Sequence, residues 1–293
     1  MKLDTWKEKG QYHTVLGHEV FTVEAGTGSD HLLILHGYPS SAYDFLHVLE
    51  PFGQHYHTVV HDHLGFGLSD KPLAYSYSLI EQTDMALALW AKMGIKKGHI
   101  VAHDYGTSIA TELVARQLLG HLDFEIQSLT LANGSMHIEM AQLRPIQRLL
   151  RHPFWGERVA KLTRRPLFLR NMKKLWGDPS RIQEGELETL WELLMYKEGR
   201  QVIAPVTRYL DDRRKFWHRW IGGLQQTKLP IHVLWATEDP VAVVAMADTL
   251  HHEIQHSKLS LLHGLGHYPM LEDPATWAKA VLGYLKDFPR HSH

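Results

Sequence analysis

The chain has 293 residues, of which 44% are hydrophobic, and a formal net charge of −1. These values exclude a largely disordered chain and leave enough apolar side chains for a large core and an inserted subdomain. The sequence has no cysteine, which excludes disulfides and thiol chemistry. The near-neutral charge gives no indication of nucleic-acid binding.

The chain shows no sign of membrane insertion or secretion. No apolar run approaches the roughly 20 residues that cross a bilayer, and residues 1–10 are charged rather than signal-like. We therefore expect a cytoplasmic protein.

Strand and helix patterns alternate along the first half of the chain. Because alternation of this kind is typical of a parallel sheet with crossover helices, we expect an α/β architecture. The predicted elements are a hairpin at 15–24, strands at 32–35, 58–60 and 126–131, and helices at 79–93 and after residue 106.

The alternation stops after the sixth predicted strand. From residue 135 to residue 226 the sequence carries helical patterns rich in Trp and Arg, interrupted by prolines. We interpret 135–226 as a helical cap inserted into a core formed by 1–134 and 227–293. Strands resume at 231–235 and 259–262.

The segment Ala102-His103-Asp104-Tyr105-Gly106 follows an apolar strand and opens a helical pattern. Small residues on either side of a central nucleophile are typical of a nucleophile elbow, a tight turn from strand to helix. The central residue is Asp104, and a carboxylate attacks saturated carbon to form an ester, whereas Ser or Cys would indicate acyl transfer. Capping of the following helix is the structural alternative for Asp104.

Three further motifs fall in the order that this chemistry needs. The turn His36-Gly37-Tyr38-Pro39 follows a strand, so the backbone amides of Tyr38 and Tyr105 are candidate oxyanion donors. Asp239 follows the strand at 231–235 and is the candidate orienting acid, with the adjacent Glu238 as the alternative. His267 follows the last strand and is the candidate general base.

With these motifs the chain resembles the epoxide hydrolase and haloalkane dehalogenase branch of the α/β-hydrolases over nearly its whole length. Within that branch it is most similar to the mesoderm-specific-transcript type, because of residues 62–72 (DHLGFGLSDKP), 103–106 (HDYG) and 209–220. The resemblance implies an α/β-hydrolase fold with a mostly parallel, eight-stranded sheet flanked by helices and an inserted helical cap. It implies a small-molecule substrate, no cofactor or metal, and a monomer or homodimer.

The resemblance favours hydrolysis of an epoxide to a diol through an ester on Asp104. Related epoxide hydrolases protonate the leaving oxygen from cap tyrosines, which points to Tyr209 and, as its partner, Tyr196. Trp155 and His103 are further candidates for substrate binding.

Dehalogenation of a haloalkane or haloacid is the second candidate function. Haloalkane dehalogenases hold the halide with a Trp after the nucleophile and a second Trp or Asn, whereas this chain has Tyr105 and Tyr38 at the corresponding places. A catalytically idle scaffold that binds a small molecule is an alternative of another class. Ester hydrolysis is disfavoured, because an aspartate that attacks an acyl carbon forms an anhydride.

Two other patterns have simpler explanations. His252-Glu253-Ile254-Gln255-His256 matches the zinc-peptidase pattern, but chance matches are common in a chain with 23 histidines. Residues 140–220 hold 18 Lys+Arg against 9 Asp+Glu. We interpret this basic segment as a solvated surface in preference to a site for anionic substrates or an acidic membrane.

Overall fold

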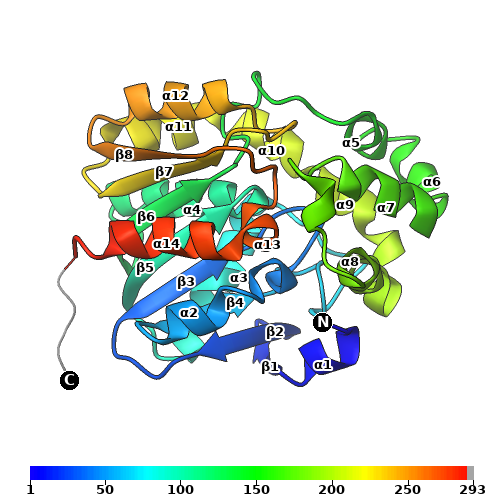
Figure 1. Cartoon of the computed structure of the whole chain (residues 1–293), viewed down its shortest axis with the longest axis horizontal. Helices are drawn as coiled ribbons and strands as arrows, with labels where there is room; N and C mark the ends of the chain where they lie inside the picture. The colour runs from blue at the N-terminus through cyan, green and yellow to red at the C-terminus, as the bar shows by residue number, and fades with distance from the viewer. Residues whose placement is uncertain (289–293) are drawn as a thin grey trace.

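The computed structural model describes residues 1–288, so the last five residues of the predicted core segment 227–293 lie outside the described residues. Eight strands form one sheet in the order β1-β2-β4-β3-β5-β6-β7-β8 (Figure 1). The strands are β1 (Gly10–Val15), β2 (His18–Ala25), β3 (His31–Leu35), β4 (His57–His61), β5 (Lys97–His103), β6 (Glu125–Ala132), β7 (Ile231–Ala236) and β8 (Ser257–Leu262).

Strands β3 to β8 run parallel to one another, and β2 is antiparallel to both β1 and β4. The α/β fold with a mostly parallel, eight-stranded sheet is therefore confirmed. The initial hairpin begins at Gly10 rather than at residue 15. Strand β1 lies at the sheet edge and is mostly solvent-exposed, so its sequence carries little of the apolar alternation that marks a buried strand.

Helices cover the sheet on both faces. The helices outside the predicted cap are α1 (Leu3–Lys7), α2 (Leu49–Gly53), α3 (Leu79–Lys92), α4 (Tyr105–Leu118), α12 (Val244–Glu253), α13 (Pro269–Glu272) and α14 (Pro274–Leu285), with a 3₁₀ turn η1 (Ala42–Phe45). The region between β6 and β7 contains α5 (Pro145–Leu150), α6 (Gly156–Lys161), α7 (Arg165–Lys173), α8 (Glu186–Met195), α9 (Ile203–Thr207), α10 (Tyr209–Lys215) and α11 (Trp217–Gln226), with η2 (Pro179–Arg181) and η3 (Tyr196–Gln201).

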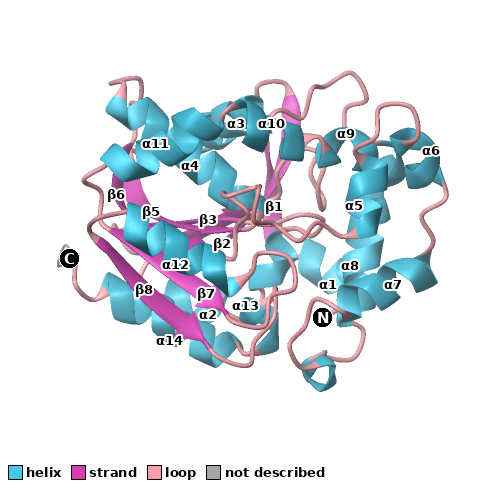
Figure 2. Cartoon of the chain, turned by 90° about the horizontal axis from the view of Figure 1, so that it is seen from above, coloured by secondary structure: helices cyan, strands magenta, loops and turns pink. Residues whose placement is uncertain are grey.

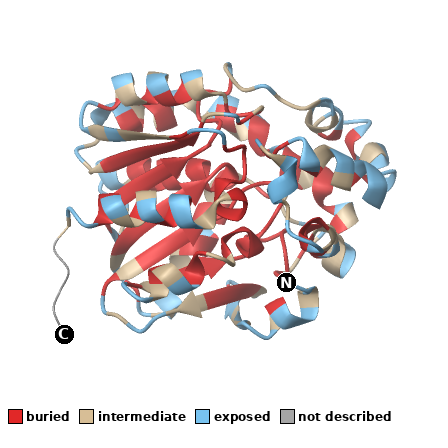
Figure 3. Cartoon of the chain, viewed as in Figure 1, coloured by how far each residue is buried: buried red, intermediate tan, exposed pale blue. Residues whose placement is uncertain are grey.

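Each face of the sheet has its own apolar core. In β3, Leu33 and Leu35 pack with α3, α4, α11 and α12, whereas Leu32 and Ile34 pack with α2 and α14. A strand covered on both faces is apolar at successive positions, which explains the continuous run at 32–35. Figure 3 shows the central strands buried under this double cover.

The helices between β6 and β7 fall into two groups. Helices α5 to α8 gather at one end of the molecule, beside the sheet rather than over either face (Figure 2). Helix α11 packs along α4, next to the sheet. The cap bounds of 135 and 226 stay a prediction. Within residues 1–288 no helix is long and apolar enough to cross a membrane.

Candidate active site

The nucleophile elbow is formed by the junction of β5 and α4. Asp104 has φ 42° and ψ −104°, a conformation that L-residues rarely adopt and that is found at functional sites. Gly106 allows the close approach of α4 to β3, because a Cβ there would collide with the carbonyl oxygen of Leu35. The amide of Gly106 donates to the carbonyl of His36 at 3.0 Å. The elbow thereby places the Asp104 carboxyl group beyond the carboxyl end of the sheet.

The turn after β3 contacts this carboxylate directly. The amide of Tyr38 donates to Oδ2 of Asp104 at 3.0 Å. Gly37 is needed there, since a Cβ would lie 2.8 Å from Nδ1 of His103 and 3.0 Å from Cβ of Asp104. Tyr105 is the first residue of α4, and its amide has no acceptor among residues 1–288. The Tyr38 amide therefore contacts the carboxylate, and the service of the Tyr38 and Tyr105 amides as oxyanion donors stays a prediction.

His267 and Asp239 lie in loops after β8 and β7. Nδ1 of His267 donates to Oδ2 of Asp239 at 2.6 Å, whereas Glu238 is solvent-exposed. Asn133, at the end of β6, donates to the same oxygen at 2.8 Å. The amides of Val241 and Ala242 donate to the other oxygen of Asp239. The carboxylate is therefore fully hydrogen-bonded and fixes which nitrogen of His267 faces Asp104.

His267 and Asp104 form a buried pair of opposite charges. Nε2 of His267 lies 3.9 Å from Oδ2 of Asp104, a distance typical of an ion pair and too long for a hydrogen bond. Burial alone lowers the pKa of His267, but Asp239 and Asp104 outweigh it and raise that pKa to about 10. Burial alone raises the pKa of Asp104, but His267 and Arg213 hold it well below its ordinary value. The resting site therefore contains an imidazolium beside an ionised carboxylate.

Arg213 of α10 is a site residue that the sequence did not indicate. Its side chain is 1% exposed, and Nη2 donates to the carbonyl of Asp104 at 2.8 Å. It stands in the basic run Arg213-Arg214-Lys215, where solvation is the ordinary expectation. The available signal was helical spacing, because Arg213 follows Tyr209 by four residues and lies on the same helix face.

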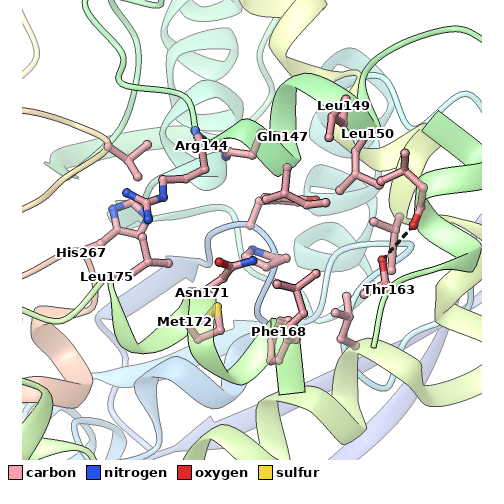
Figure 4. A pocket seen from close by; sticks show the side chains of 18 of the residues that line it. Arg144, Gln147, Leu149, Leu150, Thr163, Phe168, Asn171, Met172, Leu175 and His267 are labelled. Carbon is pink, nitrogen blue, oxygen red and sulfur yellow. Dashed lines mark hydrogen bonds between the residues drawn. The ribbon is translucent and has the colours of Figure 1, made fainter. Parts of the chain in front are cut away.

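A pocket of about 310 Å³ opens beside Asp104 and His267. Its wall is mostly aliphatic and is built largely from α5, α6 and α7 (Figure 4). Apart from Tyr38, Asp104 and His267, the polar residues of the wall are Arg144, Gln147, Thr163 and Asn171. The pocket suits a small, largely apolar molecule whose reactive carbon reaches Asp104.

The remaining candidates from the sequence lie elsewhere. Tyr209 is buried, with its ring 5.6 Å from that of Tyr38 and 4.9 Å from that of Tyr105, and its hydroxyl has no hydrogen-bond partner among residues 1–288. Tyr196 follows α8 as the first residue of η3 and lies near Lys7 and Lys71, outside the pocket wall.

Trp155 and His103 also lie outside the pocket wall. Trp155 is 54% exposed, with Arg158 over its ring. His103 is fully buried behind the elbow, where its Nε2 contacts the carbonyl of His267 at 2.8 Å. Neither Trp155 nor His103 is therefore positioned to contact a molecule in the pocket. Both positions depend on long-range packing that one sequence does not reveal.

The apparent zinc motif does not form a continuous helical face. Helix α12 ends at Glu253, so His256 lies outside it, and Nδ1 of His252 contacts the carbonyl of Asp248. Oε2 of Glu253 instead lies within hydrogen-bond distance of Nε2 of His137, at 2.8 Å. The i, i+4 geometry on which the zinc interpretation depends is absent from this part of the structure.

These features define a hydrolase of the α/β-hydrolase fold. Residues 30–274 match the family described as alpha/beta hydrolase fold, and the chain belongs to that family. The predicted resemblance to the α/β-hydrolases is thereby confirmed.

Curated relatives extend over nearly the whole chain. The putative hydrolase LipZ of Mycobacterium tuberculosis is 38% identical over 284 residues, covering 96% of this chain and 97% of that protein. The mesoderm-specific transcript homolog protein of Homo sapiens is 32% identical over 296 residues, covering 98% of this chain and 88% of that protein.

Solved structures share the fold at lower sequence identity. The haloalkane dehalogenase DbeA from Bradyrhizobium elkani matches with a TM-score of 0.81 and 22% identity, over 95% of this chain and 97% of that chain. The epoxide hydrolase CorEH matches with a TM-score of 0.79 and 15% identity, over 95% and 98%.

Proposed function

We propose that the protein hydrolyses substrates at a saturated carbon through an ester on Asp104, and that its substrates are epoxides, which it converts to diols. One observation supports this most strongly. A buried, ionised Asp104 faces an apolar pocket, with an amide donor on Oδ2 and the His267–Asp239 pair beside it. A carboxylate held in this way is a nucleophile ready to attack.

In the first step Oδ1 of Asp104 attacks the epoxide carbon. Oδ2 is held by the Tyr38 amide, whereas Oδ1 accepts no hydrogen bond within residues 1–288. The new C–O bond displaces the ring oxygen, whose electron pair must take up a proton. In the second step neutral His267 removes a proton from water, which attacks the ester carbonyl while the amides of Tyr38 and Tyr105 stabilise the oxyanion. Collapse of this intermediate releases the diol and restores Asp104.

The proton balance favours an epoxide over a haloalkane. The resting His267 is charged, yet it must be neutral to act as a base in the second step. Ring opening consumes one proton at the site, whereas departure of a halide consumes none. Opening of an epoxide therefore takes up the proton that His267 must lose before the second step.

Tyr209 is the proposed proton donor to the ring oxygen. Burial, followed by the charge of Asp104, raises its pKa well above the ordinary value, so its hydroxyl stays protonated at every working pH. An alkoxide is a stronger base than a tyrosinate, so the transfer runs toward the substrate. The tyrosinate then takes the proton of the His267 imidazolium, which restores Tyr209 and leaves His267 neutral for the second step. Neither Tyr209 nor Tyr196 lines the pocket, but the Tyr209 ring packs at 5.6 Å on that of Tyr38, which does line it. Tyr196 lies near Lys7 and Lys71 instead, so we propose Tyr209 as the donor without that partner.

The composition of the pocket wall also disfavours halide binding. The wall contains no tryptophan within the described residues. Trp176 is buried and stacks on Tyr268 at 5.1 Å, and Trp155 is exposed. Indole donors of the kind that hold a halide in dehalogenases are thus not placed at the carbon attacked by Asp104.

A substrate panel tests the proposal. Purified protein is incubated with alkyl and aryl epoxides, haloalkanes, a haloacetate and a chromogenic ester, with Asp104→Ala as the control. We expect diol formation from epoxides that Asp104→Ala does not support. Halide release alone indicates the dehalogenase, phenolate release alone an esterase, and binding without turnover the idle scaffold, and each of these results contradicts the proposal.

A further inference from the structure

The guanidinium of Arg213 joins α10 to both the elbow and the next turn of α4. Nη2 donates to the carbonyl of Asp104 at 2.8 Å, and Nε donates to Oγ of Ser108 at 2.7 Å. Ser108 follows Asp104 by four residues, so the two acceptors lie one helical turn apart. A planar guanidinium with fixed donors can hold both at once.

The same group also brings a permanent charge to the nucleophile. Nη2 lies 3.6 Å from Oδ1 of Asp104, the oxygen that is left without a hydrogen bond. Both side chains are buried, at 1% and 4% exposure, so solvent screens the attraction only weakly. His267 is the other cation at the site, but it must lose its proton during turnover, whereas an arginine does not lose its charge at working pH.

This placement carries a cost for stability. Nη1 of Arg213 is buried and has no hydrogen-bond partner among residues 1–288. An unsatisfied buried donor destabilises a fold, and apolar residues of similar size would fill the space without that cost. Stacking on the Tyr209 ring, 4.7 Å away, occupies one face of the guanidinium but does not satisfy Nη1. The buried position of the Arg213 guanidinium is therefore explained by its contacts with Asp104 rather than by packing.

We propose that Arg213 is a positioning residue for the nucleophile: it fixes the elbow carbonyl and supplies a constant positive charge that keeps Asp104 ionised and aimed whether His267 is charged or neutral. The charged and titratable groups that face Asp104 come from five places in the fold. They are Arg213 and Tyr209 from α10, His267 and Tyr268 after β8, Asp239 behind His267, His103 from β5, and His36 and Tyr38 after β3.

The role in catalysis rests on the proposed function, but the charge effect is measurable without any substrate. Aspartate is labelled with ¹³C at the side-chain carboxyl, and the resonance of Asp104 is assigned by its loss in Asp104→Asn. The titration of that resonance is compared among wild type, Arg213→Met, Arg213→Lys and Arg219→Met. Arg219 is the matched control, because it binds Glu112 of α4 and not Asp104.

We expect Arg213→Met to raise the pKa of Asp104 by about 1 to 3, the usual effect of losing an opposite charge at this range. Arg213→Lys, which keeps the charge, and Arg219→Met should leave the pKa close to that of wild type. An unchanged pKa in a folded Arg213→Met overturns the inference. If Arg213→Met does not fold, Arg213→Lys provides the test. A rise of about 1 to 3 in the pKa of Asp104 in Arg213→Lys, although the charge is kept, also overturns the inference.

Kinetics separate positioning from charge. Ser108→Ala keeps the Arg213 charge but removes one anchor of the guanidinium. We expect Ser108→Ala to slow formation of the Asp104 ester about 10-fold at every pH. Arg213→Met should in addition raise the pH below which the rate of ester formation falls. Equal, pH-independent losses in both variants overturn the charge role. If no substrate forms an ester but the NMR shift appears, the proposed function fails while the electrostatic inference stands.

Discussion

Asp104, His267 and Asp239 come from separate loops, and the proposed mechanism gives a distinct task to each. Asp239 is held by three protein donors and orients His267, and His267 lies 3.9 Å from Asp104. In the proposed mechanism the second chemical step depends on His267, whereas the first depends on Asp104 and Tyr209. Their variants should therefore fail in different ways.

Substitution of the base should trap the intermediate. In His267→Gln the ester on Asp104 forms but is not hydrolysed, because no group activates the water. Intact-protein mass spectrometry after incubation with a turned-over epoxide should show the mass increased by one substrate. The same experiment on Asp104→Ala should show none. A His267→Gln protein that stays unmodified contradicts the two-step mechanism.

Substitution of Tyr209 should distinguish the two leaving groups. Tyr209→Phe removes only the hydroxyl, so we expect epoxide opening to slow by about 100-fold. Any residual haloalkane turnover should be unaffected, because a halide leaves without a proton. The rate of ester formation measured in single turnovers checks both statements. Equal loss with both substrate types indicates that the ring serves in packing against Tyr38 and Tyr105.

Residue types and order were enough to predict which residues come together at the elbow, because each lies in a turn or loop that follows a strand. The motif predicts that the Tyr38 amide lies close to Asp104, and in the structure this amide donates to Oδ2 of Asp104 at 3.0 Å. Asn133 also follows a strand, β6, but no motif marks it, and Arg213 follows no strand. Arg213 comes from α10, 109 residues beyond Asp104, and its burial depends on how α10 docks on α4.

At the level of elements, the site depends on how closely the turn after β3 approaches the elbow. Gly37 lies where a Cβ would come within 3.0 Å of Asp104 and 2.8 Å of His103. Both neighbours are fully buried and have little room to move. The contact between the oxyanion turn and the nucleophile therefore requires glycine.

Gly37→Ala should impair both stability and activity. Relief of the overlap must displace the Tyr38 amide from Asp104, at a cost on the order of 1 to 3 kcal/mol in the free energy of unfolding. Gly283→Ala on α14 is the matched control, since its Cβ meets no atom within 4 Å and should stabilise the helix by about 0.5 to 1 kcal/mol. Chemical denaturation and kcat of the two variants check this. Unchanged kcat in Gly37→Ala contradicts the role of the turn.

The strands and core helices followed from local patterns, whereas the arrangement of α5 to α11 did not. Buried parallel strands such as β3 are recognised in the sequence by their runs of apolar residues. The short helices of the insertion are instead fixed by contacts far apart in sequence, such as that of α11 with α4. For this reason Tyr196 and Trp155 were assigned to the pocket, while the aliphatic wall from α5 to α7 was not foreseen.

For the molecule as a whole, stability should depend on pH through His267. Its pKa is raised from an ordinary 6.5 to about 10, so its contribution is complete below pH 6.5 and is lost as the pH rises through 10. We expect the free energy of unfolding of wild type, relative to His267→Gln, to fall by a few kcal/mol between these limits, at about 1.4 kcal/mol for each unit of pKa difference. Urea denaturation across this range measures it. A constant difference contradicts a charged resting His267.

The basic segment at 140–220 should have little influence on neutral substrates. Charges on a solvated surface are screened within about 10 Å at 0.1 M salt. We expect kcat/KM for an uncharged epoxide to be the same at low and high ionic strength. A steep loss with added salt would instead indicate that the segment guides the substrate electrostatically.

The incorporation of oxygen from water into Asp104 tests the central claim most directly. During many turnovers in H₂¹⁸O, the water that cleaves the ester leaves its oxygen in the Asp104 carboxyl group, and the product diol carries an oxygen from the enzyme. Mass spectrometry of the peptide that contains Asp104 should therefore show ¹⁸O, with none in the peptide that contains Asp239. Sustained diol formation with ¹⁸O only in the product, and never in Asp104, would contradict the covalent mechanism.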